Sequence, residues 1–114
     1  MSSTAQDLYS KSIDLKNLLR YQPHSIVSRE LVKNKSGSIT MFAFDMNQGL
    51  SEHTAPFDAY LQVLEGKAEV TINSEPKEVN TGEFIIMPAN IPHSVRAIRP
   101  FKMLLVMIKE IQTI

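Results

Sequence analysis

From residue 25 to residue 108, hydrophobic and polar residues alternate in short runs, as they do in β-strands with one buried face. Turn residues separate these runs at intervals of about 8–12 residues, which is typical of a sandwich or barrel. We expect the two runs on either side of Gly66 to pair, and the last run, which is almost wholly apolar, to be central and covered on both faces. The pattern predicts strands over residues 25–32, 38–44, 59–64, 68–72, 77–79, 84–87, 93–98 and 101–108.

The segment before these runs has a different pattern. Residues 1 to about 10 are polar and predict a loosely held arm. Leu15, Leu18 and Leu19 follow with helical spacing; Asp14 is a candidate cap for a short helical turn, which Pro23 ends. We therefore expect an arm over residues 1–24 and an all-β barrel over residues 25–114.

Length, charge and composition exclude several classes of protein. The 114 residues suffice for one hydrophobic core, and 12 basic against 12 acidic residues give no basic face for nucleic acid. The absence of cysteine excludes disulfides, thiolate metal sites and cysteine nucleophiles. Neither a signal-peptide pattern nor a membrane-spanning apolar run of roughly 20 residues is present. We expect a soluble cytoplasmic protein without nucleic-acid or membrane partners.

Two segments, residues 49–66 and 82–93, carry the candidate chemistry. Each places a histidine, His53 or His93, beside a strand-like run that Gly and Pro interrupt. Imidazole is the commonest metal-ligating side chain, and a small β-barrel can hold one small ligand inside. The sequence therefore predicts a pocket at these two histidines.

The spacing within the two segments resembles the two motifs of small single-domain cupins. In the first segment His53 matches a metal-ligating histidine, whereas Ala55 and Ala59 stand where the family has a second histidine and a glutamate. The second segment matches at Pro88 and His93. The resemblance implies a jelly-roll-like barrel of roughly eight to ten strands. It also implies a homodimer, in which the strand over residues 25–32 crosses between subunits.

The incomplete ligand set leaves three interpretations open. In the first, His53, His93 and a substitute oxygen hold a divalent metal, and a bulge turns Asp58 inward to supply that oxygen. In the second, no metal is bound and the two histidines bind a polar or anionic group of a small molecule. In the third, both histidines are structural and hydrogen-bonded within the core.

The resemblance implies a small-molecule-binding cupin whose substrate the sequence does not name. As an enzyme it would be a metal-assisted isomerase, lyase or oxygenase, or would use His53 and His93 as general base and acid without metal. The alternative is a non-catalytic, metal-independent ligand-binding or sensor module. A purely structural scaffold is a third possibility and predicts a filled barrel. The numerous methionines fit either core packing or a pocket lining.

Overall fold

The computed structural model of the chain describes residues 5–109 and confirms the all-β fold. Two short 3-10 helices, η1 and η2, precede nine strands in this part of the chain. Within the described residues, no helix has the length and apolarity that crossing a membrane requires. The bounds are η1 Ala5–Leu8, η2 Leu15–Asn17, β1 Ile26–Asn34, β2 Gly37–Phe44, β3 Gly49–His53, β4 Asp58–Glu65, β5 Lys67–Ile72, β6 Glu75–Asn80, β7 Phe84–Met87, β8 His93–Ala97 and β9 Phe101–Ile108.

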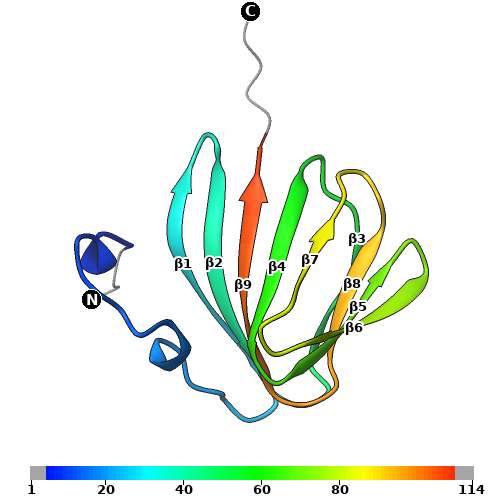
Figure 1. The fold of residues 1–114 in the computed structure, drawn as a ribbon, viewed down its shortest axis with the longest axis horizontal. Coiled ribbons are helices and arrows are strands. Elements are labelled where there is room, and N and C mark those ends of the chain that lie inside the picture. The colour runs from blue at the N-terminus through cyan, green and yellow to red at the C-terminus, as the bar shows by residue number, and fades with distance from the viewer. Residues whose placement is uncertain (1–4, 110–114) are drawn as a thin grey trace, which may run out of the picture.

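The strands form two antiparallel sheets that face each other (Figure 1). The first sheet has the order β1-β2-β9-β4-β7 and the second has the order β3-β8-β5-β6. β9 is the middle strand of the larger sheet, as its apolar sequence predicts. The prediction that both its faces are covered is only partly right, because Phe101 and Lys102 are buried whereas Ile108 is 62% exposed.

The hydrophobic core lies between the two sheets. Alternate residues of each strand point into it because side chains in a strand alternate between the two faces. Phe44 of β2 stacks on Phe101 of β9 with ring centroids 4.5 Å apart, and Leu61 and Val63 of β4 are fully buried beside them. This core fixes the distance between the sheets and thereby the shape of the barrel interior.

The runs on either side of Gly66 do not pair with each other, contrary to the sequence prediction. β4 belongs to the larger sheet and β5 to the smaller one. Gly66 lies between them with a φ of +86°, and a Cβ atom there would lie 2.1 Å from the carbonyl oxygen of Pro100. The chain therefore changes sheets at Gly66, because only glycine combines this backbone conformation with so close an approach.

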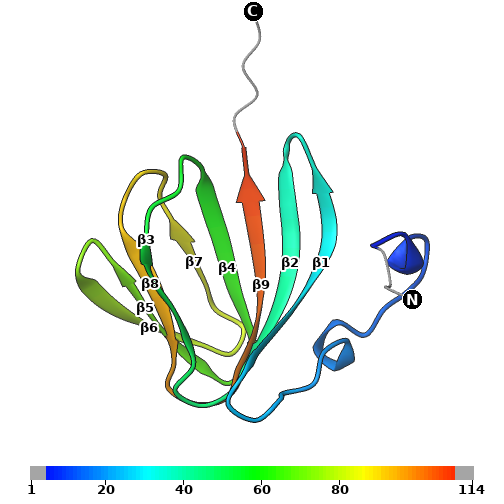
Figure 2. The same ribbon diagram turned by 180° about the vertical axis from the view of Figure 1, so that it is seen from behind.

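The N-terminal arm packs on the outer face of the larger sheet, beside β1 (Figure 2). Leu19 is buried against Met41 and Ala43 of β2. The buried Lys102 donates a hydrogen bond to the carbonyl of Lys16, and the Tyr21 hydroxyl donates one to Glu65 at 2.6 Å. The arm is thus fastened to the barrel by both apolar and polar contacts.

The structure corrects two details of the predicted arm. η1 occupies part of the segment expected to be loosely held. Asp14 precedes η2, as predicted, but makes no side-chain hydrogen bond to the helix backbone. Its carboxylate accepts a hydrogen bond from the Asn17 side chain instead. The turn is one 3-10 turn of three residues, too short to need a full α-helical cap.

Candidate functional site at the His53 and His93 pair

The two candidate histidines lie side by side at neighbouring strand ends. His53 is the last residue of β3 and His93 is the first residue of β8. The two strands pair antiparallel, and the register sets His53 directly opposite His93. A backbone hydrogen bond from Asn90 to the carbonyl of Ala55, 2.7 Å long, also joins the loops that follow β3 and precede β8. Sheet pairing therefore brings together two residues that are 40 positions apart in the sequence.

The hydrogen bonds of the two rings define their tautomers. His53 Nδ1 lies 2.8 Å from the carbonyl oxygen of Ser51, and His93 Nδ1 lies 3.1 Å from that of Ile91. A carbonyl oxygen only accepts, so each Nδ1 carries a proton and donates it. In a neutral imidazole the other nitrogen, Nε2, is then an acceptor. Both rings of the neutral pair consequently have an unprotonated Nε2.

The two Nε2 atoms converge. They are 3.2 Å apart, and the rings meet nearly edge to face with centroids separated by 4.4 Å. Two acceptor nitrogens at this separation repel each other unless a proton, a cation or the donor group of another molecule lies between them. The neutral pair is therefore a site for a proton, a cation or a hydrogen-bond donor.

The two rings differ in burial. His93 is 4% exposed, whereas His53 is exposed at the surface. Burial lowers the pKa of His93, and the nearby His53 lowers it further, although the hydrogen bond to Ile91 acts in the opposite direction. His93 is accordingly neutral at neutral pH, which keeps its Nε2 available as an acceptor.

A small apolar cavity adjoins the pair at this end of the barrel. Its volume is about 40 Å³, and both histidines line it. Ala55 and Ala59 line it as well, so both alanines lie where the sequence predicts the pocket, although Ala55 lies in the loop after β3 rather than on a strand. The other lining residues are all apolar, and every one except Phe57, which lies in the loop before β4, belongs to a strand: Leu50, Phe57, Met87, Val95, Met103, Leu105 and Met107.

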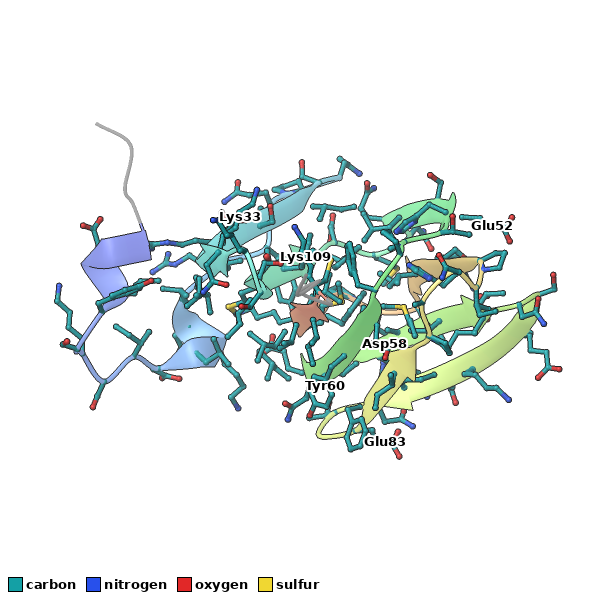
Figure 3. The ribbon with its side chains drawn as sticks, turned by 90° about the horizontal axis from the view of Figure 1, so that it is seen from above. Lys33, Glu52, Asp58, Tyr60, Glu83 and Lys109 are labelled. Atoms are coloured by element: carbon teal, nitrogen blue, oxygen red, sulfur yellow. The ribbon has the colours of Figure 1, made fainter. Side chains whose placement is uncertain are left out.

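Asp58 lies outside this cavity. It begins β4, is exposed, and its Oδ1 accepts a hydrogen bond of 2.9 Å from the backbone N–H of Ala89. It lines a separate surface groove with Lys109. In Figure 3, Asp58 and Glu52 lie on different strands of the molecule, and Glu52 is exposed on β3. Neither carboxylate is among the residues that line the cavity.

The donor set supplies only part of a family-type metal site. Among the described residues, no group of three or more His, Cys, Asp or Glu side chains is arranged to hold a metal ion. Ala55 and Ala59 contribute methyl groups where two further ligands would be needed. The residues do not fit a four-ligand metal centre, and what the chain offers is two convergent imidazole nitrogens.

Two backbone carbonyls were not identified from the sequence although they are essential to the geometry. Those of Ser51 and Ile91 orient the two rings, and each belongs to the residue two positions before its histidine. Any residue type has a carbonyl, so residue identities carried no signal for this role. The equal spacing becomes meaningful only once the backbone conformation is known.

Comparisons with known proteins agree with this architecture. The family model described as "Cupin domain" matches residues 41–108. A conserved protein of unknown function from Streptococcus pyogenes is 38% identical, with 91% of each chain covered and a TM-score of 0.87. A cupin 2 conserved barrel domain protein from Leptotrichia buccalis is 37% identical, with a TM-score of 0.83; the match covers 85% of this chain and 47% of that one.

A more distant structure shares the fold alone. Salicylate 1,2-dioxygenase from Pseudaminobacter salicylatoxidans is 16% identical, with a TM-score of 0.68, and the match covers 75% of this chain and 26% of that one. No curated protein matches the sequence. The two motif segments, the jelly-roll-like barrel and a family match over more than half of its length show that the chain belongs to the cupin family.

Proposed function

We propose that this cupin binds a small molecule through the Nε2 atoms of His53 and His93. The observation that carries the proposal is the convergence of these two nitrogens, 3.2 Å apart, at an apolar cavity. Each ring donates its Nδ1 proton to a backbone carbonyl, so neither can donate from Nε2 in the neutral state. A hydrogen-bond donor on the ligand can therefore satisfy the neutral pair.

The acceptor character of the pair selects the chemistry of the ligand. A hydroxyl or amine group donates a hydrogen bond to Nε2. A carboxylate is only an acceptor, so its oxygen lone pairs repel the lone pairs of the two Nε2 atoms. An anionic group accepts hydrogen bonds and therefore needs a protonated Nε2, and the burial of His93 opposes protonation of that ring. We infer a neutral protic ligand, such as an alcohol, phenol or enol, rather than an anion.

The cavity limits what can lie behind this polar group. A cavity of about 40 Å³ has room for only a few water molecules. A larger ligand must extend outward past the exposed His53 or displace the thioether side chains that line the cavity. Met87, Met103 and Met107 can adapt in this way because their side chains are unbranched and flexible. The ligand is thus small or lies mostly at the mouth of the barrel.

The same geometry is compatible with acid–base chemistry. A neutral His93 accepts a proton at Nε2 from a hydroxyl or from a carbon acid beside a carbonyl, and this proton passes to the Nε2 of His53, 3.2 Å away. The exposed His53 then returns the same proton elsewhere on the substrate. Such a pair would catalyse isomerisation or elimination without metal. A non-catalytic binding or sensor module would use the same contacts without turnover, and assays for proton exchange distinguish the two.

A second candidate, a metal-assisted enzyme, is favoured by one specific observation. Two imidazole ligands of a tetrahedral ion, each about 2.0–2.1 Å from it, have their nitrogens roughly 3.3 Å apart. The Nε2 separation of 3.2 Å is close to this value. A metal bound there would polarise an oxygen of the substrate, and water or substrate would complete its coordination. His53 and His93 would supply the only two protein ligands we can assign.

Metal analysis separates the two candidates. The protein is purified without a histidine tag or chelator, and its metal content is measured beside that of a His53→Ala, His93→Ala double variant. The proposal predicts little metal in the wild-type protein and no tight binding of added Zn²⁺. Near-stoichiometric metal that is lost in the double variant would establish the metal-assisted candidate instead.

Ligand chemistry is tested with a matched pair of probes. Phenol and benzoate have the same ring but differ in carrying a neutral donor or an anion. We expect phenol to shift the imidazole NMR resonances of both histidines and benzoate to have a much smaller effect at neutral pH. Preferential binding of benzoate, or phenol binding that persists in the double variant, would contradict the proposal.

A further inference from the structure

The hydroxyl of Ser38 is a buried polar group that the fold does not satisfy. Ser38 lies on β2 and is 7% exposed. Within residues 5–109, its Oγ is the one buried side-chain nitrogen or oxygen atom that has no hydrogen-bond partner. Buried polar groups are almost always hydrogen-bonded, because an unpaired group loses its bonds to water without replacement. The unpaired hydroxyl therefore points to a partner that is not part of the chain.

Ser38 belongs to a row of side chains that leads to the histidine cavity. It lies opposite Met107 of β9, which in turn lies opposite Ala59 of β4. Ala59 lies opposite Met87 of β7. Side chains at opposite positions of antiparallel strands share one face of the sheet, and the last three members of the row line the cavity. Ser38 therefore faces the interior of the barrel, one strand spacing of about 4.8 Å beyond Met107.

The side chain of Met107 lies between the Ser38 hydroxyl and the cavity. Met107 lines the cavity of about 40 Å³ and also a surface groove of about 300 Å³, which Ser38 lines as well. Met107 is half-buried, and its unbranched thioether is flexible. Rotation of this side chain toward the groove joins the two spaces and places Ser38 at the far end of a longer pocket. An organic molecule that the cavity alone excludes can enter such a pocket.

We propose that Ser38 is a further ligand-binding residue, and that the ligand is a neutral molecule with an oxygen at each end of a short apolar body, such as a diol or a hydroxyketone. The inference rests on the proposed function, because one hydroxyl of the ligand donates to the Nε2 pair of His53 and His93. The second oxygen displaces the Met107 side chain and bonds to the Ser38 hydroxyl, which can donate or accept. Ser38 thereby distinguishes between protic ligands that the histidines alone would treat alike.

The lining of both spaces favours a neutral group at each end of the ligand. Among the described residues, those that line the cavity or the groove include no Asp, Glu, Lys or Arg. A charged group beside Ser38 would lack a counter-ion, and burial of an unpaired charge is strongly unfavourable. The row from Ser38 to Ala59 spans two strand spacings, roughly 10 Å, so the ligand is elongated. Its middle lies against thioether and methyl groups and is therefore apolar.

Two phenols of matched shape test the role of Ser38. Para-hydroxymethylphenol and para-ethylphenol present the same phenolic hydroxyl to the histidines, and differ in carrying a hydroxyl or a methyl group at the far end. Titration of the imidazole NMR resonances measures both dissociation constants. We expect the preference for para-hydroxymethylphenol over para-ethylphenol to fall by roughly 5- to 10-fold in Ser38→Ala, because one hydrogen bond is lost. Ser28→Ala, the same change at an exposed position of β1 that lines neither space, should leave the preference unchanged.

Folding and side-chain movement supply two further readouts. Ser38→Ala replaces an unpaired hydroxyl by a hydrogen atom, so the midpoint of urea unfolding should not fall. A serine that the fold needs would lower this midpoint. In a spectrum of ¹³C-methyl-labelled methionines, the Met107 resonance should shift when para-hydroxymethylphenol binds to the wild-type protein, because the side chain must move to admit the ligand.

The outcomes distinguish this inference from the function on which it rests. If both phenols shift the histidine resonances but Ser38→Ala leaves their relative affinity unchanged, the histidine site stands and the role of Ser38 is overturned. An unmoved Met107 resonance in the complex, or a lower unfolding midpoint for Ser38→Ala, would overturn that role in the same way. If neither phenol affects the histidines, the proposed function and this inference fail together.

Discussion

His53 and His93 occupy equivalent positions at paired strand ends, yet their surroundings make them unequal residues. Each donates its Nδ1 proton to the carbonyl two residues earlier. His93 is buried, so its ring is held in place by the packing around it. His53 is exposed, so its ring is accessible to a ligand. From this difference in burial we infer that His93 is the fixed acceptor of the pair and that His53 is the accessible acceptor.

Alanine substitution should separate these roles in stability. His53→Ala removes an exposed ring and should change the free energy of unfolding by less than about 1 kcal/mol. His93→Ala leaves a cavity and an unpaired Ile91 carbonyl, and we expect a loss of about 1–3 kcal/mol. Urea unfolding measures both values. A loss above ~3 kcal/mol for His53→Ala would mean that this ring belongs to the folding core.

The burial of His93 also predicts a dependence of stability on pH. The folded state holds the pKa of His93 below its ordinary value of 6.5, so the unfolded chain binds this proton first as pH falls. Stability is therefore highest above pH 6.5 and decreases as pH falls from there toward the folded pKa. Urea unfolding of wild type and His93→Gln at about pH 7.5 and about pH 5.5 tests this. An equal pH dependence in both proteins would assign it to other groups.

Residue identities pointed to part of the candidate site, whose role in binding stays a prediction. The motif spacing indicated His53 and His93, and the structure brings them into contact; Ala55 and Ala59 line the same cavity. Asp58 is held by the Ala89 N–H, and nothing in its sequence position indicated that bond. Hydrogen bonds to the main chain depend on loop conformation, which residue type does not encode.

At the scale of elements, the glycines determine where the chain changes direction. Gly66 connects β4 to β5 across the two sheets, and Gly82 precedes β7. Their φ values are nearly equal, +86° and +85°, but their surroundings differ. A Cβ atom at Gly66 would collide with Pro100 and Phe101, whereas nothing lies within 4 Å of one at Gly82. A side chain at Gly66 therefore has both a steric and a conformational cost, whereas a side chain at Gly82 has only the conformational cost.

Alanine at these two glycines measures that difference. Gly82→Ala should cost about 1 kcal/mol, since only the left-handed backbone conformation opposes it. Gly66→Ala should cost at least about 3 kcal/mol, because the backbone of residues 100 and 101 must also move. Thermal and urea unfolding provide the values. Equal costs at both positions would show that the β4–β5 connection relaxes freely.

The sequence predicted strands correctly where hydrophobic and polar residues alternate clearly. It did not predict which strands far apart in the sequence pair with one another. Eight predicted runs correspond to strands, and β9 is central as expected. β3 was not predicted as a strand, because its residues Gly49–His53 include polar and exposed positions. The pairing of β4 with β9 and β7, rather than with β5, depends on the global arrangement of two sheets. The hydrophobic pattern of a single strand does not specify which strands it pairs with.

At the scale of the whole molecule, the interior of the barrel contains a small void beside the two histidines. The cavity of about 40 Å³ is lined by methyl groups at Ala55 and Ala59, where the family resemblance implies a histidine and a glutamate. A purely structural scaffold predicts no such void at the paired imidazoles. The two alanines thus give the cavity an apolar surface behind the acceptor pair.

Introducing the histidine and glutamate that the family resemblance implies tests whether the barrel has the geometry of a metal site. The double change Ala55→His, Ala59→Glu should add two donors to His53 and His93, and so tighten Zn²⁺ binding by ~10-fold or more. Calorimetric titration measures the affinity, with Ala59→Glu alone as the control. An unchanged affinity in a folded double variant would mean that these alanines do not occupy ligand positions.

The most direct test of the account is a long-range ¹H–¹⁵N NMR spectrum of the metal-free protein at neutral pH. It reports which nitrogen of each imidazole is protonated. We predict that His53 and His93 are both protonated at Nδ1 and that both Nε2 atoms are free acceptors, as their bonds to Ser51 and Ile91 require. A spectrum in which either ring carries its proton on Nε2 would show that the pair already satisfies itself, and would remove the basis for a ligand between them.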